Sequence, residues 1–350
     1  MPPPSSPAQN AIELRGVRKT FGTKVAVHDL DLVIPVGSLH GFIGPNGAGK
    51  TTTIRMIMSI IFPDKGEIAV LGRKSAVESK DRIGYLPEER GIYKKMKVGP
   101  FLKYMGRLKG LPNDGLESKV RAWLERVGLE REYRKRCEEL SKGMQQKVQF
   151  ISAIMHEPEL IILDEPFSGL DPVNSRMLRA LIDEQRASGR TIIFSTHQMS
   201  QAEALCDRVV MIHRGVKVLD NTPSAVHSRF DPRAIAMEPV TPLRDYSVIE
   251  RIPQVESVKE VGRLLHVHVR DRVATEAVIP LLAAAVPVRR IEVVRPSLED
   301  VFISIVQTSD SPAEHAALLA SLHPEGVGAP GEELPAGLVA TGKSGDQGGD

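Results

Sequence analysis

Eight residues near the start of the chain have the types and spacing needed to hold a phosphate group. They read Gly44-Pro45-Asn46-Gly47-Ala48-Gly49-Lys50-Thr51, after the apolar stretch 39–43 and before a stretch, 52–58, whose apolar spacing suits a helix. Glycines let successive backbone N–H groups point at one anion, and the positive end of the helix dipole adds to the attraction. Lys50 can reach the β and γ phosphates, and the Thr51 hydroxyl is a candidate Mg²⁺ ligand. The pattern predicts a P-loop.

Two later stretches end in side chains that could act on a bound phosphate. The apolar run 160–163 ends in Asp164 and Glu165, and the run 191–196 ends in His197. Such runs suit buried parallel strands, whose carboxyl ends open on a site. Asp164 could hold Mg²⁺, Glu165 could accept a proton from water, and His197 could hydrogen-bond the γ phosphate. A lone histidine more often packs in a core, but this one ends the same kind of strand as Asp164.

An aromatic residue, Phe21, lies at a predicted turn between two strands. Residues 11–34 alternate apolar and polar side chains, as paired strands do, and the turn falls at residues 21–23. An exposed aromatic there could stack on a nucleotide base, whereas an aromatic at a hairpin corner could equally pack in a core. The residues alone leave both interpretations open.

The remaining pattern predicts an α/β domain with a mainly parallel sheet. Residues 98–150 have helical spacing of apolar residues, a helix is expected over 199–206, and residues 209–219 suit a hairpin that turns at Arg214-Gly215. Four prolines then mark a boundary, at positions 223, 232, 239 and 242. Beyond it we expect a hairpin over 255–269, a helix over 274–285, a strand over 288–294 and a last helix opened by a capping box at Ser297 and Asp300.

Length and composition limit the class of protein. The 350 residues suffice for one large and one small domain, and a net charge of +2 gives no reason to expect nucleic acid as a partner. Only two cysteines occur, Cys137 and Cys206, which suggests a reducing compartment. No apolar run is long enough to span a bilayer. Residues 1–10 and 307–350 are expected to be disordered, because they are rich in Pro, Gly and polar residues.

A stretch shortly before Asp164 carries a specific resemblance. Leu140-Ser141-Lys142-Gly143-Met144-Gln145 resembles the signature motif of the ATPases of ABC transporters. The order of the other motifs is similar to that family: an upstream aromatic, the P-loop, a loop at Glu88, the signature, the pair Asp164-Glu165, a D-loop at 168–171 and His197. The resemblance covers about residues 11–222.

The resemblance implies a fold and a shared site. The expected fold is a P-loop NTPase domain over 11–222, with a parallel core sheet, an antiparallel β subdomain and a helical subdomain at about 98–150. ATP would lie between the P-loop of one subunit and the signature of another, in a homodimer or in a heterodimer with a related ATPase. Glu165, His197 and Lys50 would be catalytic, and Thr51, Asp164 and Glu88 would hold Mg²⁺. The nucleotide contacts would be Phe21, Gly44, Pro45, Asn46, Gly47, Ala48, Gly49, Lys50, Thr51 and Thr52, with Ser141, Gly143 and Asp171 from the second subunit.

Two departures from the family pattern stand out. Lys142 and Met144 replace a Gly and a Gln of the usual signature, whereas Ser141 and Gly143, the contact residues, are retained. Glu88 stands where the family usually has a Gln that ligates Mg²⁺ and couples the site to the transporter. A carboxylate can still ligate Mg²⁺, but it adds negative charge beside the phosphates.

Residues 232–306 resemble the small α+β accessory domain carried by ATPase subunits of bacterial ABC-2-type exporters. This similarity rests on the stretch 295–302, Arg-Pro-Ser-Leu-Glu-Asp-Val-Phe. It implies an ATPase subunit that drives an ABC-2-type permease from the cytoplasmic face of the plasma membrane. The first alternative is a soluble ABC ATPase that acts on ribosomes or DNA, although the chain has one cassette and no heptads. The second is a module that binds ATP without hydrolysis, against which Glu165 and His197 argue.

Overall fold

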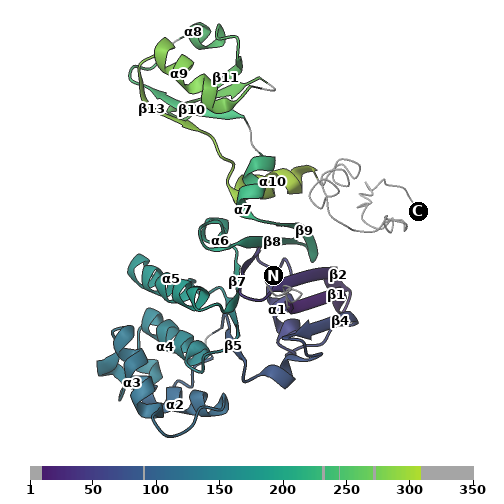
Figure 1. Ribbon diagram of the computed structural model, residues 1–350, viewed down its shortest axis with the longest axis vertical. Coiled ribbons are helices and arrows are strands. Elements are labelled where there is room, and N and C mark those ends of the chain that lie inside the picture. The colour runs from purple at the N-terminus through teal and green to yellow at the C-terminus, as the bar shows by residue number, and fades with distance from the viewer. Residues whose placement is uncertain (1–9, 90, 231–232, 244, 271–272, 309–350) are drawn as a thin grey trace, which may run out of the picture.

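The computed structural model describes residues 10–89, 91–230, 233–243, 245–270 and 273–308. Within these residues the chain forms a larger body and a smaller one (Figure 1). The predicted disordered segments fall outside the described residues, apart from Asn10 at the start of the first strand and residues 307 and 308 at the end of the last helix. No helix of the described part is both long and apolar enough to cross a membrane.

A six-stranded sheet forms the centre of the larger body and confirms the predicted parallel core. Its order is β5-β6-β7-β3-β8-β9, and all neighbours are parallel except the hairpin β8–β9. Every residue of β3, β6 and β7 is buried, which explains their continuous apolar sequences. The strands are β3 (Leu39–Ile43), β5 (Ile83–Leu86), β6 (Leu160–Asp164), β7 (Thr191–Thr196), β8 (Arg208–His213) and β9 (Val216–Asn221).

Strand order brings the motif-bearing ends together. β7 lies between β6 and β3, and its Ser195 is level with Asp164 of β6 while Thr196 is level with Ile43 of β3. The P-loop follows β3, Glu165 follows β6, and His197 follows β7. Because these three strands are parallel and in register, the three motifs emerge at the same edge of the sheet.

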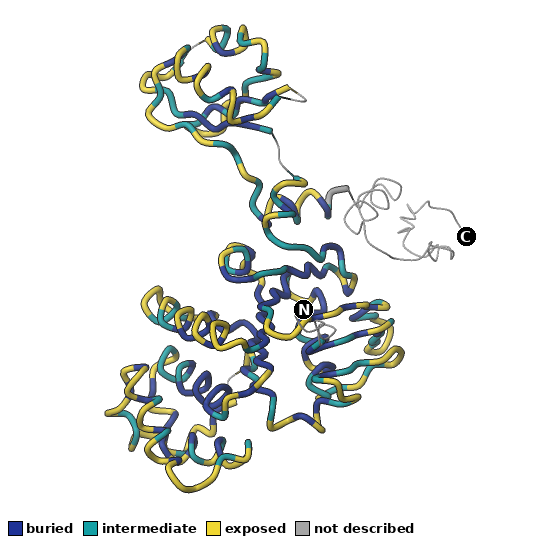
Figure 2. The backbone as a smooth tube through the Cα atoms, in the orientation of Figure 1, coloured by how far each residue is buried: buried dark blue, intermediate teal, exposed yellow. Residues whose placement is uncertain are grey.

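An antiparallel sheet packs beside the central one, as the alternating pattern predicted. Its order is β2-β1-β4, with β1 (Asn10–Phe21), β2 (Lys24–Pro35) and β4 (Lys65–Val70). The β1–β2 hairpin closes with Phe21 paired to Lys24. Apolar residues of this sheet share a core with α1 (Lys50–Ile57) and with the strands behind it, which appears as buried backbone in Figure 2. Phe21 is thereby fixed at the closed end of the hairpin, beside the turn.

The stretch 98–150, predicted as helical, contains three helices rather than one continuous segment. They are α2 (Val98–Leu108), α3 (Leu116–Arg126) and α4 (Lys142–Ile154), and 3₁₀ turns follow α3 at Glu130–Glu132 and Cys137–Glu139. Gly110, Gly115 and Gly128 adopt positive φ where these helices end or begin. A further 3₁₀ turn lies at Ala76–Ser79, and α5 (Pro172–Ala187) and α6 (Met199–Leu205) complete the helices before residue 222.

The C-terminal part contains the predicted hairpin, middle helix, last strand and last helix. They are β11 (Val255–Val261), β12 (Leu264–Val269), α9 (Thr275–Ala285), β13 (Val288–Val293) and α10 (Leu298–Thr308). The capping box is present: Asp300 N donates to Ser297 Oγ at 3.1 Å, and Ser297 N donates to Asp300 Oδ2 at 2.9 Å. α10 nevertheless packs on the larger body, because Leu298, Val301 and Ile305 are part of its core.

Three elements of this part were not predicted. They are α7 (Pro223–Arg229), β10 (Ala234–Pro239) and α8 (Ser247–Glu250), where the prolines suggested only a boundary. Pro223 is instead the first residue of α7, after Thr222, whose hydroxyl caps the helix; proline is tolerated there because its missing N–H has no helical partner. β10 is an inner strand of the antiparallel sheet β11-β12-β10-β13, and Pro239 stands at its end.

Candidate functional site

The P-loop wraps closely around the start of α1. Gly44 has φ 146°, and a Cβ there would lie 2.1 Å from the carbonyl oxygen of Ile212. Gly49 has φ 112°, and a Cβ there would lie 2.6 Å from the carbonyl oxygen of Ala26. Both glycines are therefore required by conformation and by space. They let the loop lie against β2 and β8 while its backbone N–H groups at the helix start remain available to an anion.

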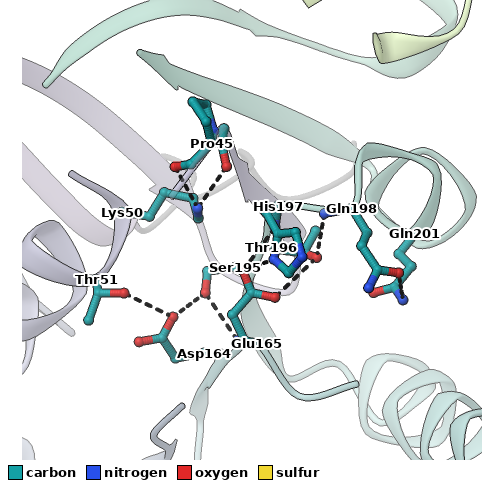
Figure 3. A network of polar contacts seen from close by, with 11 residues as sticks. Pro45, Lys50, Thr51, Asp164, Glu165, Ser195, Thr196, His197, Gln198 and Gln201 are labelled. Carbon is teal, nitrogen blue, oxygen red and sulfur yellow. Dashed lines mark hydrogen bonds and ion pairs between the residues drawn. The ribbon is translucent and has the colours of Figure 1, made fainter. Parts of the chain in front are cut away.

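Lys50 is a buried cation surrounded by carboxylates. Its side chain is 5% exposed, and its Nζ donates to the carbonyl oxygens of Gly44 at 2.7 Å and Pro45 at 3.2 Å (Figure 3). Burial lowers its pKa, and the negative charges of Glu165, Asp164 and Glu88 oppose that shift. Its position inside the loop lets the ammonium exchange carbonyl partners for phosphate oxygens.

Asp164 provides an oxygen suited to a metal ion. The residue is buried: Ser195 Oγ donates to its Oδ1, and Thr51 Oγ1 lies 3.5 Å from the same oxygen. Its Oδ2 is buried with no hydrogen-bond partner among the described residues. Burial raises the pKa of this carboxyl, and the hydrogen bonds from Ser195 and Thr51 oppose the rise. An unpaired carboxylate oxygen beside a threonine hydroxyl fits Mg²⁺, which binds through few protein oxygens together with substrate phosphates and water.

Glu165 and His197 meet at the ends of β6 and β7 (Figure 3). Glu165 Oε1 accepts hydrogen bonds from the His197 backbone N and from its ring Nδ1, both at 2.9 Å. Thr196 Oγ1 lies 3.4 Å from Oε2. Glu165 also adopts φ 49°, a left-handed conformation uncommon for a residue with a side chain. The carboxylate is thus held in one direction by His197, through its backbone N and its ring Nδ1.

An open cavity of about 370 Å³ joins most of the predicted residues. Phe21, half of whose surface is exposed, stands on its wall, and Lys19 Nζ lies 5.5 Å from the centroid of the ring. Glu88 and Glu165 line the same cavity as the P-loop. The lining residues are Phe21, Lys24, Ala26, Asn46, Gly47, Ala48, Gly49, Lys50, Thr51, Thr52, Glu88 and Glu165. An exposed aromatic ring, the P-loop and two carboxylates therefore face one space.

The signature and D-loop residues do not line this cavity. Ser141 caps α4, where its hydroxyl accepts from Met144 N at 3.3 Å, and Asp171 caps α5, where it accepts from Val173 N and Asn174 N. Gly143 faces the Asn174 side chain, and a Cβ at this glycine would lie 2.9 Å from Asn174 Nδ2. Gly143 and Asp171 thus both lie next to Asn174, and Ser141 caps the helix to which Gly143 belongs.

Ser195 is a site residue that the sequence patterns missed. Its hydroxyl donates to Asp164 Oδ1 and accepts from the backbone N of Glu165 at 3.3 Å, so it orients the Asp164 carboxylate and holds the backbone of Glu165. Lys24 and Ala26 of β2 also line the cavity without having been predicted. Ser195 could have been found once β7 was placed beside β6. In that arrangement Ser195 is level with Asp164 on the neighbouring strand.

Two protein-family models match the chain. The model described as ABC transporter matches residues 27–168, and the model described as the C-terminal domain of DrrA1-3-like ATP-binding proteins matches residues 222–306. The second match begins at residue 222, the N-cap of α7.

Individual relatives extend the similarity over most of the chain. The uncharacterized ABC transporter ATP-binding protein YhaQ of Bacillus subtilis is 40% identical over 83% of this chain and 96% of its own. The Nod factor export ATP-binding protein I of a Rhizobium species is 33% identical over 84% of this chain and 96% of its own. A solved structure of an ATP binding subunit of an ABC transporter superposes with a TM-score of 0.59 at 31% identity, covering 63% of this chain and 93% of that chain.

Proposed function

Because the chain belongs to the family of ABC transporter ATP-binding proteins, which are ATPases, we propose that it powers a membrane exporter of the ABC-2 class. ATP hydrolysis, the first part of this proposal, is supported by the cavity in which Lys50 of the P-loop and Glu165 face one space. A site that only binds ATP needs the loop but has no use for a base held by His197. The transported substrate would be selected by the membrane partner.

In this mechanism Phe21 stacks on the adenine, and the P-loop N–H groups with Lys50 hold the phosphates. Glu165 accepts a proton from a water molecule whose oxygen forms a bond to the γ phosphorus. The bond from that phosphorus to the bridging oxygen breaks, and ADP keeps the electron pair. Mg²⁺ would neutralise charge on the β and γ phosphates, and Thr51, Asp164 and Glu88 would hold it.

A second subunit is proposed to complete the site. Ser141 and Asp171 are exposed, and together with Gly143 they cluster away from the cavity of their own chain. In a head-to-tail dimer Ser141 and the Gly143 backbone would contact the γ phosphate held by the other chain, and Asp171 would cross the interface. The dimer could pair two copies of this chain or this chain with a related ATPase.

The exporter assignment rests on the accessory domain and on the relatives. The DrrA1-3-like model covers residues 222–306, and a relative that aligns over most of both chains is named as a Nod factor export protein. An ABC-2-type permease is therefore the proposed partner. Since that permease lies in the membrane, the proposed location is the cytoplasmic face of the plasma membrane, as a peripheral subunit.

Co-purification tests the exporter proposal. The tagged chain is expressed with the membrane protein encoded beside its gene and extracted in mild detergent. We expect the two to co-purify, and we expect ATP hydrolysis by the complex to depend on the membrane protein. Recovery of the chain with ribosomes, and without the membrane protein, would contradict the proposal and favour the soluble alternative.

Replacing Glu88 tests its proposed role as metal ligand and coupling residue. Glu88→Gln is expected to raise the Mg²⁺ concentration needed for half-maximal hydrolysis several-fold, because a neutral amide oxygen binds the cation more weakly than a carboxylate. Hydrolysis is measured as a function of Mg²⁺, with and without the permease. Glu89→Gln is the control, since Glu89 is equally exposed and does not line the cavity. Unchanged Mg²⁺ dependence and unchanged coupling in Glu88→Gln would refute the role.

A further inference from the structure

The last helix returns from the accessory domain to the ATPase domain. Leu298, Val301 and Ile305 of α10 are at most 1% exposed and lie on one face of the helix. They belong to the core that includes Leu205 and Cys206 at the end of α6, not to the separate core of the accessory sheet. α10 accordingly lies against α6 and α7 (Figure 1). The accessory domain is therefore inserted between two helices of the larger body, α7 and α10.

A polar contact joins the entry and the exit of this insertion. His227 on α7 donates from Nδ1 to the carbonyl oxygen of Pro296 at 2.8 Å, and its Nε2 lies 2.8 Å from Glu203 Oε1 on α6. The other oxygen of Glu203 lies 3.5 Å from the backbone N of Leu298, at the start of α10. Both nitrogens of the His227 ring face acceptors, so the ring donates to both when it carries both protons. Glu203 and His227 thus fasten α6, α7 and α10 to one another.

α6 leads directly back to the catalytic centre. It begins at Met199, two residues after His197, and Glu203 lies one helical turn further along. Met199, Ala202 and Leu205 are buried, and the helix packs on β3 and β7. A shift of α6 would consequently move His197, whose ring and backbone N hold Oε1 of Glu165.

We propose that Glu203 and His227 are positioning residues that clamp α10 and the exit of the accessory domain onto α6, and so set His197 against Glu165. A partner that moves the accessory domain pulls on both of its connections, and the force reaches α6 through this clamp. The accessory domain thereby regulates the rate of hydrolysis without touching the nucleotide. This inference rests on the proposed function, since it requires that Glu165 and His197 hydrolyse ATP.

The test separates turnover from binding in the full-length protein. Glu203→Gln and His227→Gln are each expected to lower kcat for ATP hydrolysis on the order of tenfold, because small displacements of catalytic groups cost rate steeply. KM for ATP and the affinity for a fluorescent ATP analogue should stay near the parent values, since Phe21 and the P-loop bind the nucleotide. The double variant should be no slower than the slower single variant, because both changes open the same contact.

Glu238→Gln is the matched control. Glu238 pairs with Arg289 inside the accessory domain, and its side chain is 28% exposed, as is that of Glu203. This variant should keep the parent kcat. Unfolding temperatures of all variants are measured, and we expect them to stay close to the parent value because the exchanged groups are partly solvated.

Two results would overturn the clamp. One is a kcat within about twofold of the parent in both Glu203→Gln and His227→Gln, since a positioning role must appear in turnover. The other is an equal loss in the Glu238→Gln control. A parent chain that hydrolyses no ATP even in complex with the permease would refute the proposed function itself, so the two failures are distinguishable.

Discussion

Glu165→Gln should lose ATP hydrolysis by on the order of 10²-fold or more while still binding ATP. The amide keeps the shape of the side chain, and its oxygen can still accept from the His197 backbone N, which donates to Glu165 at 2.9 Å. It cannot take a proton from water. Turnover is measured by phosphate release under saturating ATP, and binding is measured by equilibrium titration with a fluorescent ATP analogue.

Glu184→Gln controls for the loss of a carboxylate elsewhere in the ATPase domain. Glu184 lies on α5, is half-exposed and pairs with Arg126, so its replacement should leave turnover unchanged. A fully active Glu165→Gln protein would remove Glu165 from the role of base. A variant that loses ATP binding together with turnover would show that the carboxylate has a structural role instead.

Lys50→Met should abolish hydrolysis and weaken ATP binding together. The change removes the cation that lies near Glu165, Asp164 and Glu88. The carbonyl oxygens of Gly44 and Pro45 lose the ammonium donor, although the Pro45 oxygen still accepts from Ala48 N at 3.2 Å. The loop must then bind the negatively charged phosphates of ATP without the lysine cation and with three carboxylates nearby. Lys24→Met is the control, because Lys24 lines the same cavity at its exposed rim. Equal losses in the two variants would mean that the effect is not specific to Lys50 and follows from the loss of either positive charge near the cavity.

The same variant can test the shared site. Lys50→Met keeps its signature residues, and Ser141→Arg keeps its P-loop, so each homodimer should be inactive. Mixing them should restore about a quarter of the parent activity per chain, because half of the dimers are mixed and each holds one intact site. If mixing leaves activity at the level of the separate variants, the result would contradict a site formed by the P-loop of one chain and the signature of the other.

Candidate site residues that directly follow an apolar run could be placed from the sequence alone. The P-loop, Asp164, Glu165 and His197 each follow an apolar run, and the parallel sheet brings those run ends to one edge. Ser195 could not be found in this way. Its importance comes from the position of β7 beside β6, which is a property of strand order and not of the residues around it.

The C-terminal part shows where local patterns mislead. Prolines at 223 and 239 suggested a boundary, yet one begins α7 and the other ends β10, both positions where a missing N–H costs little. The pairing partners of β10, β12 and β13, come later in the sequence, so no local pattern indicates an inner strand. The packing of α10 on α6 is equally non-local, since its apolar face could cover either domain.

The packing of α10 on the ATPase domain also determines where the chain can be truncated. A chain cut after residue 222 would lose Leu298, Val301 and Ile305 and leave apolar surface of α6 open to solvent. The accessory domain, in contrast, enters and leaves at adjacent points, because His227 and Pro296 are in hydrogen-bond contact. Insertions with adjacent ends are readily exchanged during evolution. One ATPase domain could therefore acquire different accessory domains between α7 and α10 without changing its own core.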